Sequence, residues 1–163
     1  KLGKLRDSKR LSAKQRENWL DYIKSSPQIL FATASVYPKV IDRVNISGAA
    51  NLASTRALKK LLKNNKILIK NMTTLLDGGL KILGGIPYKS VIGGDEKHDP
   101  IKLASIVAKV KRDGFLKRYQ KKYPGYDFGE HKGYGTKAHI AALKKRGISK
   151  MHRLTFVKNF VRI

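Results

Sequence analysis

Apolar positions along the chain follow two alternating patterns, one typical of helices and one typical of strands. From Ser12 to Pro27 apolar residues recur at helical spacing, and Ser12 and Gln15 have the spacing of a capping box, so a helix is predicted that ends before Pro27. Residues 29–36, "ILFATASV", are a compact run rich in β-branched residues, which predicts a strand. Leucines at helical spacing then predict a second helix, with Ser47 as a candidate cap.

The alternation continues with shorter elements. "MTTLLDGG" and "YKSVIGGD" are short apolar runs in which Gly and Asp stand together at the end, and each is predicted to be a strand that places Asp77 or Asp95 at the end of a sheet. Residues 100–122 predict a long helix, the turn-rich "YPGYDFGEHKGYGT" a loop, and "KAHIAALKKRG" a short helix that ends at Gly147. This order predicts a single α/β domain over residues 1–163.

Charge narrows the range of partners. The chain has 36 Lys and Arg against 11 Asp and Glu, a net charge of +25, which favours nucleic acid first and an anionic membrane second. No apolar run approaches the roughly 20 residues that span a bilayer, so we expect no membrane partner. The sequence contains no Cys, which suits a cytoplasmic location, and we expect a monomer. The chain starts at Lys1 rather than Met, which suggests that it begins partway through a longer product.

Acidic residues are concentrated in one short stretch of this basic chain, where Asp95, Glu96 and Asp99 fall within five residues. If the strands that end near Asp77 and Asp95 are adjacent, their carboxylates lie close together and suit Mg²⁺ or Mn²⁺, which can activate water beside a phosphate. Alternatively, "DGG" and "GGD" are only turns, in which Asp binds its own backbone, and spacing alone favours that interpretation. Glu96 and Asp99 are expected to remain solvated.

Six blocks of sequence, taken in order, change that balance. They are "LRDSKRLSAKQRE", "VIDRVNISGAANLASTRAL", "LLDGG", "VIGGDEKHDPIKLASIVAKVKRDGF", "YPGYDFGEHKGYGTKAHIAALKKRG" and "MHRLTF". Over residues 5–156 they resemble the signature blocks of the ribonuclease HII family. The resemblance implies an RNase H-like fold, a mixed sheet flanked by helices. It also implies an endonuclease that cuts the RNA strand of RNA/DNA hybrids and incises duplex DNA at embedded ribonucleotides.

The resemblance further implies a site for Mg²⁺ or Mn²⁺ built from four carboxylates, of which Asp77 and Asp95 match the third and fourth. The first two form an adjacent Asp-Glu pair on an opening strand, followed by a Gly-Arg-Gly turn. No segment of this chain matches that strand, so the chain is expected to lack it and to hold half of the metal ligands. Either the strand has been lost from this chain, or the chain is a truncated relative that binds without cutting.

Four residues are implied to bind nucleic acid. Tyr134 in "HKGYGT" matches the tyrosine that packs on the sugar at an RNA/DNA junction, although a Tyr there can also cover the edge of the core. Ser8 and Lys9 match a loop that contacts phosphate, and Lys132 is expected to make a sequence-independent phosphate contact. A lone exposed Lys is otherwise simply solvated.

The four histidines and the block that contains Ser105 are expected to serve mainly structural roles. His98, His139 and His152 are scattered single histidines, expected at the surface or in the core rather than on a metal, and nothing assigns His131 a catalytic task. The block "ASIVAKVKRD" is expected mainly to support the fold, with Ser105 facing the site as a weaker alternative.

Two hypotheses therefore remain. The first is a metal-dependent endoribonuclease of the ribonuclease HII type. The alternative is a non-catalytic basic protein that binds nucleic acid, either a truncated relative or a ribosomal-type RNA-binding component. The charge of +25 fits both equally, and the presence of an Asp-Glu-bearing strand before Lys1 would separate them.

Overall fold

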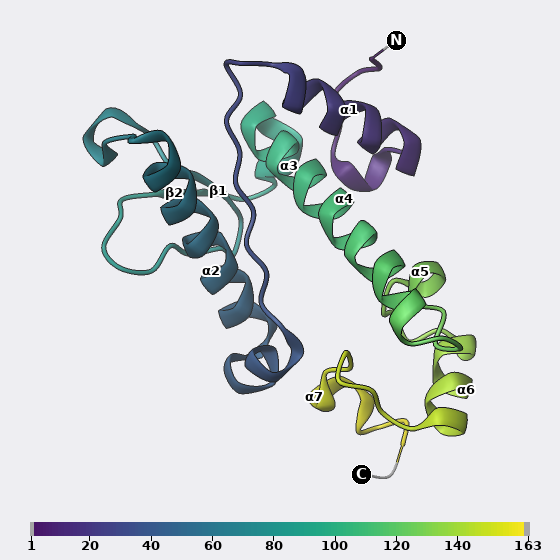
Figure 1. Cartoon of the computed structure of the whole chain (residues 1–163). Helices are drawn as coiled ribbons and strands as arrows, with labels where there is room; N and C mark the ends of the chain where they lie inside the picture. Colours follow the sequence, from purple (N-terminus) through teal and green to yellow (C-terminus); the bar gives the residue numbers. More distant parts are fainter. Residues whose placement is uncertain (1, 162–163) are drawn as a thin grey trace. The chain divides into compact units, whose positions relative to one another are not determined.

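The computed structural model describes residues 2–161, over which the chain forms helices, two short strands and two 3-10 helices (Figure 1). In chain order the elements are η1 (Ser8–Arg10), α1 (Ala13–Ser25), α2 (Pro38–Asn65), η2 (Ile69–Asn71), β1 (Leu75–Asp77), β2 (Lys89–Val91), α3 (Gly94–Lys97), α4 (Asp99–Lys122), α5 (Phe128–His131), α6 (Lys137–Arg146) and α7 (Leu154–Val157). The architecture is mixed α/β, as predicted, and is consistent with an RNase H-like fold.

The chain divides into two compact units. The first comprises Lys1–Val36 and Ile46–Val110, and the second comprises Tyr37–Asn45 and Lys111–Ile163. α2 crosses the division at Asn45, whose backbone (φ 59°, ψ 180°) is not helical and separates two helical segments. The second helical segment therefore begins ahead of the candidate cap Ser47. That the units form one domain over residues 1–163 stays a prediction.

The sheet of the first unit consists of β1 and β2, which pair in parallel with Leu75 opposite Lys89 and Asp77 opposite Val91. Its apolar cluster is formed by Leu76, Ile82 and Ile86, with Leu58 and Leu62 of α2 packed against it. Figure 1 shows the later part of α2 lying alongside the strands. Burial of this cluster is what holds two strands of three residues each in place.

α1 packs against the first half of α4 within the same unit. Its start is fixed as predicted, because the Ser12 hydroxyl accepts from the Gln15 backbone N–H (3.2 Å) and the Gln15 side chain accepts from the Ser12 N–H (2.8 Å). Leu20 and Ile23 of α1 bury their side chains against Val107 of α4. The predicted first helix and the predicted long helix are both confirmed.

The second unit is built around an aromatic core contributed by the end of α4, α5, α6 and α7. Its buried members are Leu116, Tyr126, Phe128, Leu143 and Val157. α6 begins after its cap Thr136 and ends at Gly147 (φ 77°), and its end is the one that the sequence predicts.

Asp42 holds the start of α7. Its carboxylate accepts from the backbone N–H groups of Leu154 (2.9 Å) and Thr155 (3.1 Å) and from the Thr155 hydroxyl (2.7 Å). Partial burial raises the pKa of Asp42, but these hydrogen bonds and the nearby Arg153 outweigh it, so the pKa lies below its usual value. α7 is one turn long and depends on this contact.

Three predicted elements differ from the structure. Residues 29–37 form no strand, and Leu30 and Phe31 are exposed, because no described strand lies beside them to pair with their backbone. The strand that was expected to deliver Asp95 ends at Val91, so Asp95 lies in α3 instead. The predicted loop before α6 contains the short helix α5.

Within residues 2–161, no helix has both the length and the apolar character that crossing a bilayer requires.

Candidate active site

The carboxylate of Asp77 is fixed at the end of the sheet. Asp77 is the last residue of β1, as predicted, and its Oδ1 accepts a hydrogen bond from the Gly94 backbone N–H at 2.9 Å. After β2 the chain turns through Gly93, which adopts the left-handed conformation (φ 65°), and enters α3 at Gly94. Parallel pairing of β1 and β2 thus places Asp77 against the residue that precedes Asp95.

Gly94 is buried, and the space around it explains why no larger residue stands there. A Cβ atom at this position would lie 2.6 Å from Cδ1 of Ile101 and 3.4 Å from both Cα and Oδ1 of Asp77. The absence of a side chain allows the first turn of α3 to approach the strand end closely.

Asp95 lies in the first turn of α3, where its side chain is 15% exposed. The ammonium of Lys9, itself 81% exposed, is 3.6 Å from Asp95 Oδ2. Such a long contact to an exposed Lys adds little stability. Lys9 therefore neutralises part of the charge of Asp95 while its side chain remains able to move.

Ser8 is 4% exposed, and its hydroxyl lies 2.8 Å from the hydroxyl of Ser105 on α4. This contact ties η1 to α4, while the Asp7 side chain caps η1 by accepting from the Lys9 N–H (3.0 Å). A phosphate contact by Ser8 stays a prediction, and the position of its hydroxyl suits support of Lys9 more directly.

The other two acids of the cluster are exposed, as expected, and each pairs with a basic side chain. Glu96 pairs with Arg10 at 3.2 Å and Asp99 with Lys102 at 2.8 Å. Among the described residues no group of three His, Cys, Asp or Glu side chains is arranged to hold a metal ion. Asp77 and Asp95 lie on the two elements that the Gly94–Asp77 hydrogen bond joins, and two carboxylates with water and substrate phosphate are a usual set of ligands for Mg²⁺.

The second unit carries the exposed aromatic residue that the sequence singled out. Tyr134 is 68% exposed, and it follows Lys132 (φ 52°) and Gly133 (φ 82°), both in the left-handed conformation. The Lys132 ammonium donates to the Gly129 carbonyl, so in this structure it is bound to its own loop. The loop presents a flat ring to solvent, which is the geometry that stacking on a sugar or base requires.

Behind this loop lies a cluster that the sequence did not reveal. His131, His139 and His152 are each less than 9% exposed, and their rings lie together. We expected His139 and His152 at the surface or in the core, and the structure places both in the core. The contact between the two rings was not predicted. Their separations of 8 and 13 residues match no metal or catalytic motif, so no sequence signal marks the cluster.

Burial lowers the pKa of both His139 and His152. For His152, burial and the neighbouring His139 and His131 lower the pKa from 6.5 to about 4. For His139, burial and His131 lower the pKa, opposed by the hydrogen bond to Tyr134. Both rings are therefore neutral at neutral pH.

Comparison with known proteins identifies the family to which the chain belongs. The family profile that matches the chain is that of ribonuclease HII, over residues 1–159. A ribonuclease HII from Endomicrobium trichonymphae is 44% identical over 153 residues, which cover 93% of this chain and 70% of the relative. One from Caldicellulosiruptor bescii is 40% identical, covering 96% of this chain and 73% of the relative.

A third relative, the ribonuclease HII of Fusobacterium nucleatum, is 42% identical over 164 residues, which cover 98% of this chain and 74% of that protein. The match thus extends through both units of the chain, including β1, α3 and the loop that carries Tyr134. The chain belongs to the ribonuclease HII family, a family of hydrolases that act as endoribonucleases.

Proposed function

We propose that this protein hydrolyses the RNA strand of RNA/DNA hybrids and incises duplex DNA at embedded ribonucleotides, with Mg²⁺ or Mn²⁺ bound by Asp77 and Asp95. The hydrogen bond from Gly94 to Asp77 carries the proposal, because it brings the end of β1 to the turn of α3 that holds Asp95. Asp77 and Asp95 thus belong to neighbouring elements in a chain whose net charge is +25. A protein that only binds polyanions has no need for carboxylates there.

The two carboxylates suit a hard divalent cation. The Gly94 N–H occupies Oδ1 of Asp77, which leaves Oδ2 as the ligand oxygen. A bound Mg²⁺ or Mn²⁺ would activate water and stabilise the leaving oxygen of the cut strand. Asp95 would hold the cation with Asp77, and its long 3.6 Å contact leaves Lys9 free to turn toward a substrate phosphate.

Lys9 is placed to bind a substrate phosphate next to the metal. Its backbone is fixed by Asp7, and η1 is held to α4 through Ser8 and Ser105, so the Lys9 side chain starts from a defined position. In this proposal Lys9 and Lys132 contact phosphate, Ser8 supports that contact, and Tyr134 packs on the sugar at the RNA/DNA junction. The protein would act as a cytoplasmic monomer.

The test is incision of a DNA duplex that contains one ribonucleotide, measured with Mg²⁺, with Mn²⁺ and with EDTA. We expect metal-dependent cutting by the complete gene product that is lost in Asp77→Asn and in Asp95→Asn. Asp99→Asn is the matched control, since it makes the same change four residues from Asp95 at an exposed acid. It should cut at the rate of the parent protein.

The alternative hypothesis predicts a different result. A non-catalytic basic protein would bind the duplex tightly and cut it under none of these conditions. Cutting that persists in Asp77→Asn and Asp95→Asn would instead show that other residues hold the metal.

A further inference from the structure

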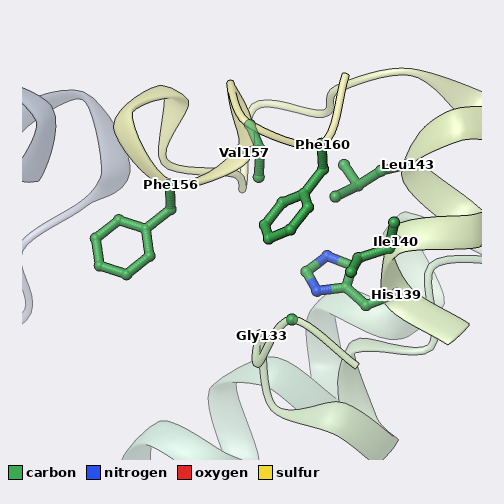
Figure 2. Close-up of a pocket in the computed structure, with 8 residues that line it drawn as sticks. Gly133, His139, Ile140, Leu143, Phe156, Val157 and Phe160 are labelled. Atoms are coloured by element: carbon green, nitrogen blue, oxygen red, sulfur yellow. The ribbon is translucent and has the colours of Figure 1, made fainter. Parts of the chain in front are cut away.

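The three buried histidines of the second unit form one contiguous cluster. The rings of His131 and His139 stack with centroids 3.9 Å apart and planes inclined by 12°, and Nε2 of His139 lies 3.1 Å from Nε2 of His152. Figure 2 shows the ring of His139 reaching from α6 toward the side of the loop that holds Gly133. We call residues 131–136 the Tyr134 loop.

Hydrogen bonds fix which nitrogen of each ring carries its proton. The Ser149 backbone N–H points at Nδ1 of His152 (2.9 Å), so that nitrogen is an acceptor and the His152 proton is on Nε2. His152 Nε2–H therefore donates to His139 Nε2. The His139 proton is then on Nδ1, which donates to the Tyr134 carbonyl at 2.8 Å.

His131 completes the contact with the loop. Its Nδ1 accepts from the Gly133 N–H at 3.0 Å, so its proton is on Nε2, which donates to the Tyr126 carbonyl. Two imidazole rings thereby hold the backbone that follows Lys132, at the Gly133 N–H and at the Tyr134 carbonyl. Each of the three rings is neutral in this arrangement, with one donor and one acceptor in use.

We propose that His139 and His152 are positioning residues for nucleic-acid binding: as a neutral pair they hold the Tyr134 carbonyl, keep the Tyr134 ring presented to the substrate, and release the loop when the pair takes up a proton. This inference rests on the proposed role of Tyr134 in binding the substrate.

Proton uptake at His139 breaks the pair because it leaves one N–H too many. If His139 gains a proton on Nε2, that N–H faces the N–H of His152 across 3.1 Å. A proton on Nδ1 of His152 can instead be accepted by the Ser149 hydroxyl, which also lies 2.9 Å from that nitrogen. The response therefore belongs to His139, whose movement carries its Nδ1–H away from the Tyr134 carbonyl.

The surroundings of the pair favour this response. The electrostatic contributions at His139 and His152 come from the other histidines, and a positive charge on any of them opposes a second. Tyr126 also packs on the pair: its ring lies 5.1 Å from that of His152, and its hydroxyl donates to backbone carbonyls. Burial lowers the pKa of both His139 and His152, in agreement with a pair that is neutral when folded.

The first measurement is nuclear magnetic resonance of the ring nitrogens in the whole protein at pH 7.5. We expect His139 with its proton on Nδ1, and His131 and His152 with theirs on Nε2. This result needs no substrate. A proton on Nε2 of His139, or a charged ring at either His139 or His152, would overturn the inference whatever the protein binds.

The second measurement is the affinity for a fluorescent duplex with one ribonucleotide, in EDTA to prevent cutting. His139→Phe keeps a ring but removes the donor, and should weaken binding by about tenfold, the lower range for loss of one stacked aromatic. His139→Asn places an amide N–H near the position of Nδ1 and should restore most of that loss. Tyr134→Ala should weaken binding as much as His139→Phe, and the double variant should lose no more than either.

The pH dependence separates positioning from general support of the fold. Between pH 7.5 and pH 4, a range that reaches the lowered pKa of the pair, the parent protein should lose more affinity than His139→Asn, which cannot titrate at this position. An equal loss in both, or additive losses in the double variant, would overturn the inference. If Tyr134→Ala binds like the parent although the ring protons are as expected, the proposed role of Tyr134 is wrong, and positioning for binding falls with it.

Discussion

The close approach of α3 to β1 can be tested by adding a single methyl group. Gly94→Ala would place a Cβ 2.6 Å from Cδ1 of Ile101, well inside van der Waals contact, and 3.4 Å from Oδ1 of Asp77. Ile101 is 7% exposed, so its side chain has little space into which to rotate. Overpacking of this kind costs about 1–3 kcal/mol, and replacing Gly in a helix returns at most about 1 kcal/mol. We therefore expect a net loss of about 1–2 kcal/mol in the free energy of unfolding.

A second substitution identifies the atom responsible. Ile101→Val removes Cδ1, the atom nearest the added methyl, and by itself should cost about 0.5–1.5 kcal/mol. In Gly94→Ala/Ile101→Val the two changes should compensate, with a coupling free energy of about 1 kcal/mol in urea unfolding. Incision activity should follow the same order, because movement of α3 shifts both the Gly94 N–H that holds Asp77 and the carboxylate of Asp95.

The reasoning is refuted if Gly94→Ala is as stable as the parent protein, or if Ile101→Val adds its own cost instead of compensating. In either case contact with Ile101 is not what requires Gly at position 94.

Three further predictions concern other parts of the chain. Gly114→Ala in α4, where the added methyl meets only the end of the Arg118 side chain at 3.7 Å, should raise the free energy of unfolding by about 0.5–1 kcal/mol in urea, and a loss would contradict the open space found there. Asp42→Ala removes the acceptor of three hydrogen bonds at the start of α7 and should cost about 1–2 kcal/mol in the free energy of unfolding, measured as a lower Tm. An unchanged Tm would show that α7 does not depend on these hydrogen bonds. The pKa of His152 is about 4 in the folded protein against 6.5 in the unfolded chain, so the neutral ring contributes its full stability above pH 6.5 and loses it as the pH falls toward 4. Over that range the free energy of unfolding of the parent protein should fall by about 3 kcal/mol more than that of His152→Asn. Parallel curves of unfolding free energy against pH would contradict the lowered pKa.

Local signals in the sequence were enough for the start of α1 and the end of α6. The capping box of Ser12 and Gln15 and the C-cap Gly147 act over three or four residues, so they determine where a helix begins or ends almost regardless of the rest of the fold. Asp77 was placed correctly for the same reason, since a Gly-Gly turn directly follows it.

Features that depend on a neighbouring element could not be predicted in this way. Residues 29–36 have a composition typical of strands, but a strand requires a partner, and no described strand lies beside them. Asp95 was expected to end a strand, but Gly93 and Gly94 let the chain turn into α3 first. The pairing of His139 with His152 depends on how α6 and the segment after it pack, which no spacing in the sequence records.

The residues proposed to act on nucleic acid lie on short elements that are held mainly by hydrogen bonds from their neighbours. Gly94 holds Asp77, Ser105 holds the turn that carries Lys9, and His139 holds the backbone of Tyr134. Elements of three to six residues bury too little apolar surface to fix a side chain through packing alone. Substitutions that keep the volume but remove one of these hydrogen bonds should therefore impair binding or cutting before they lower the stability of the protein. The large apolar clusters around Leu76 and Phe128 should show the reverse order.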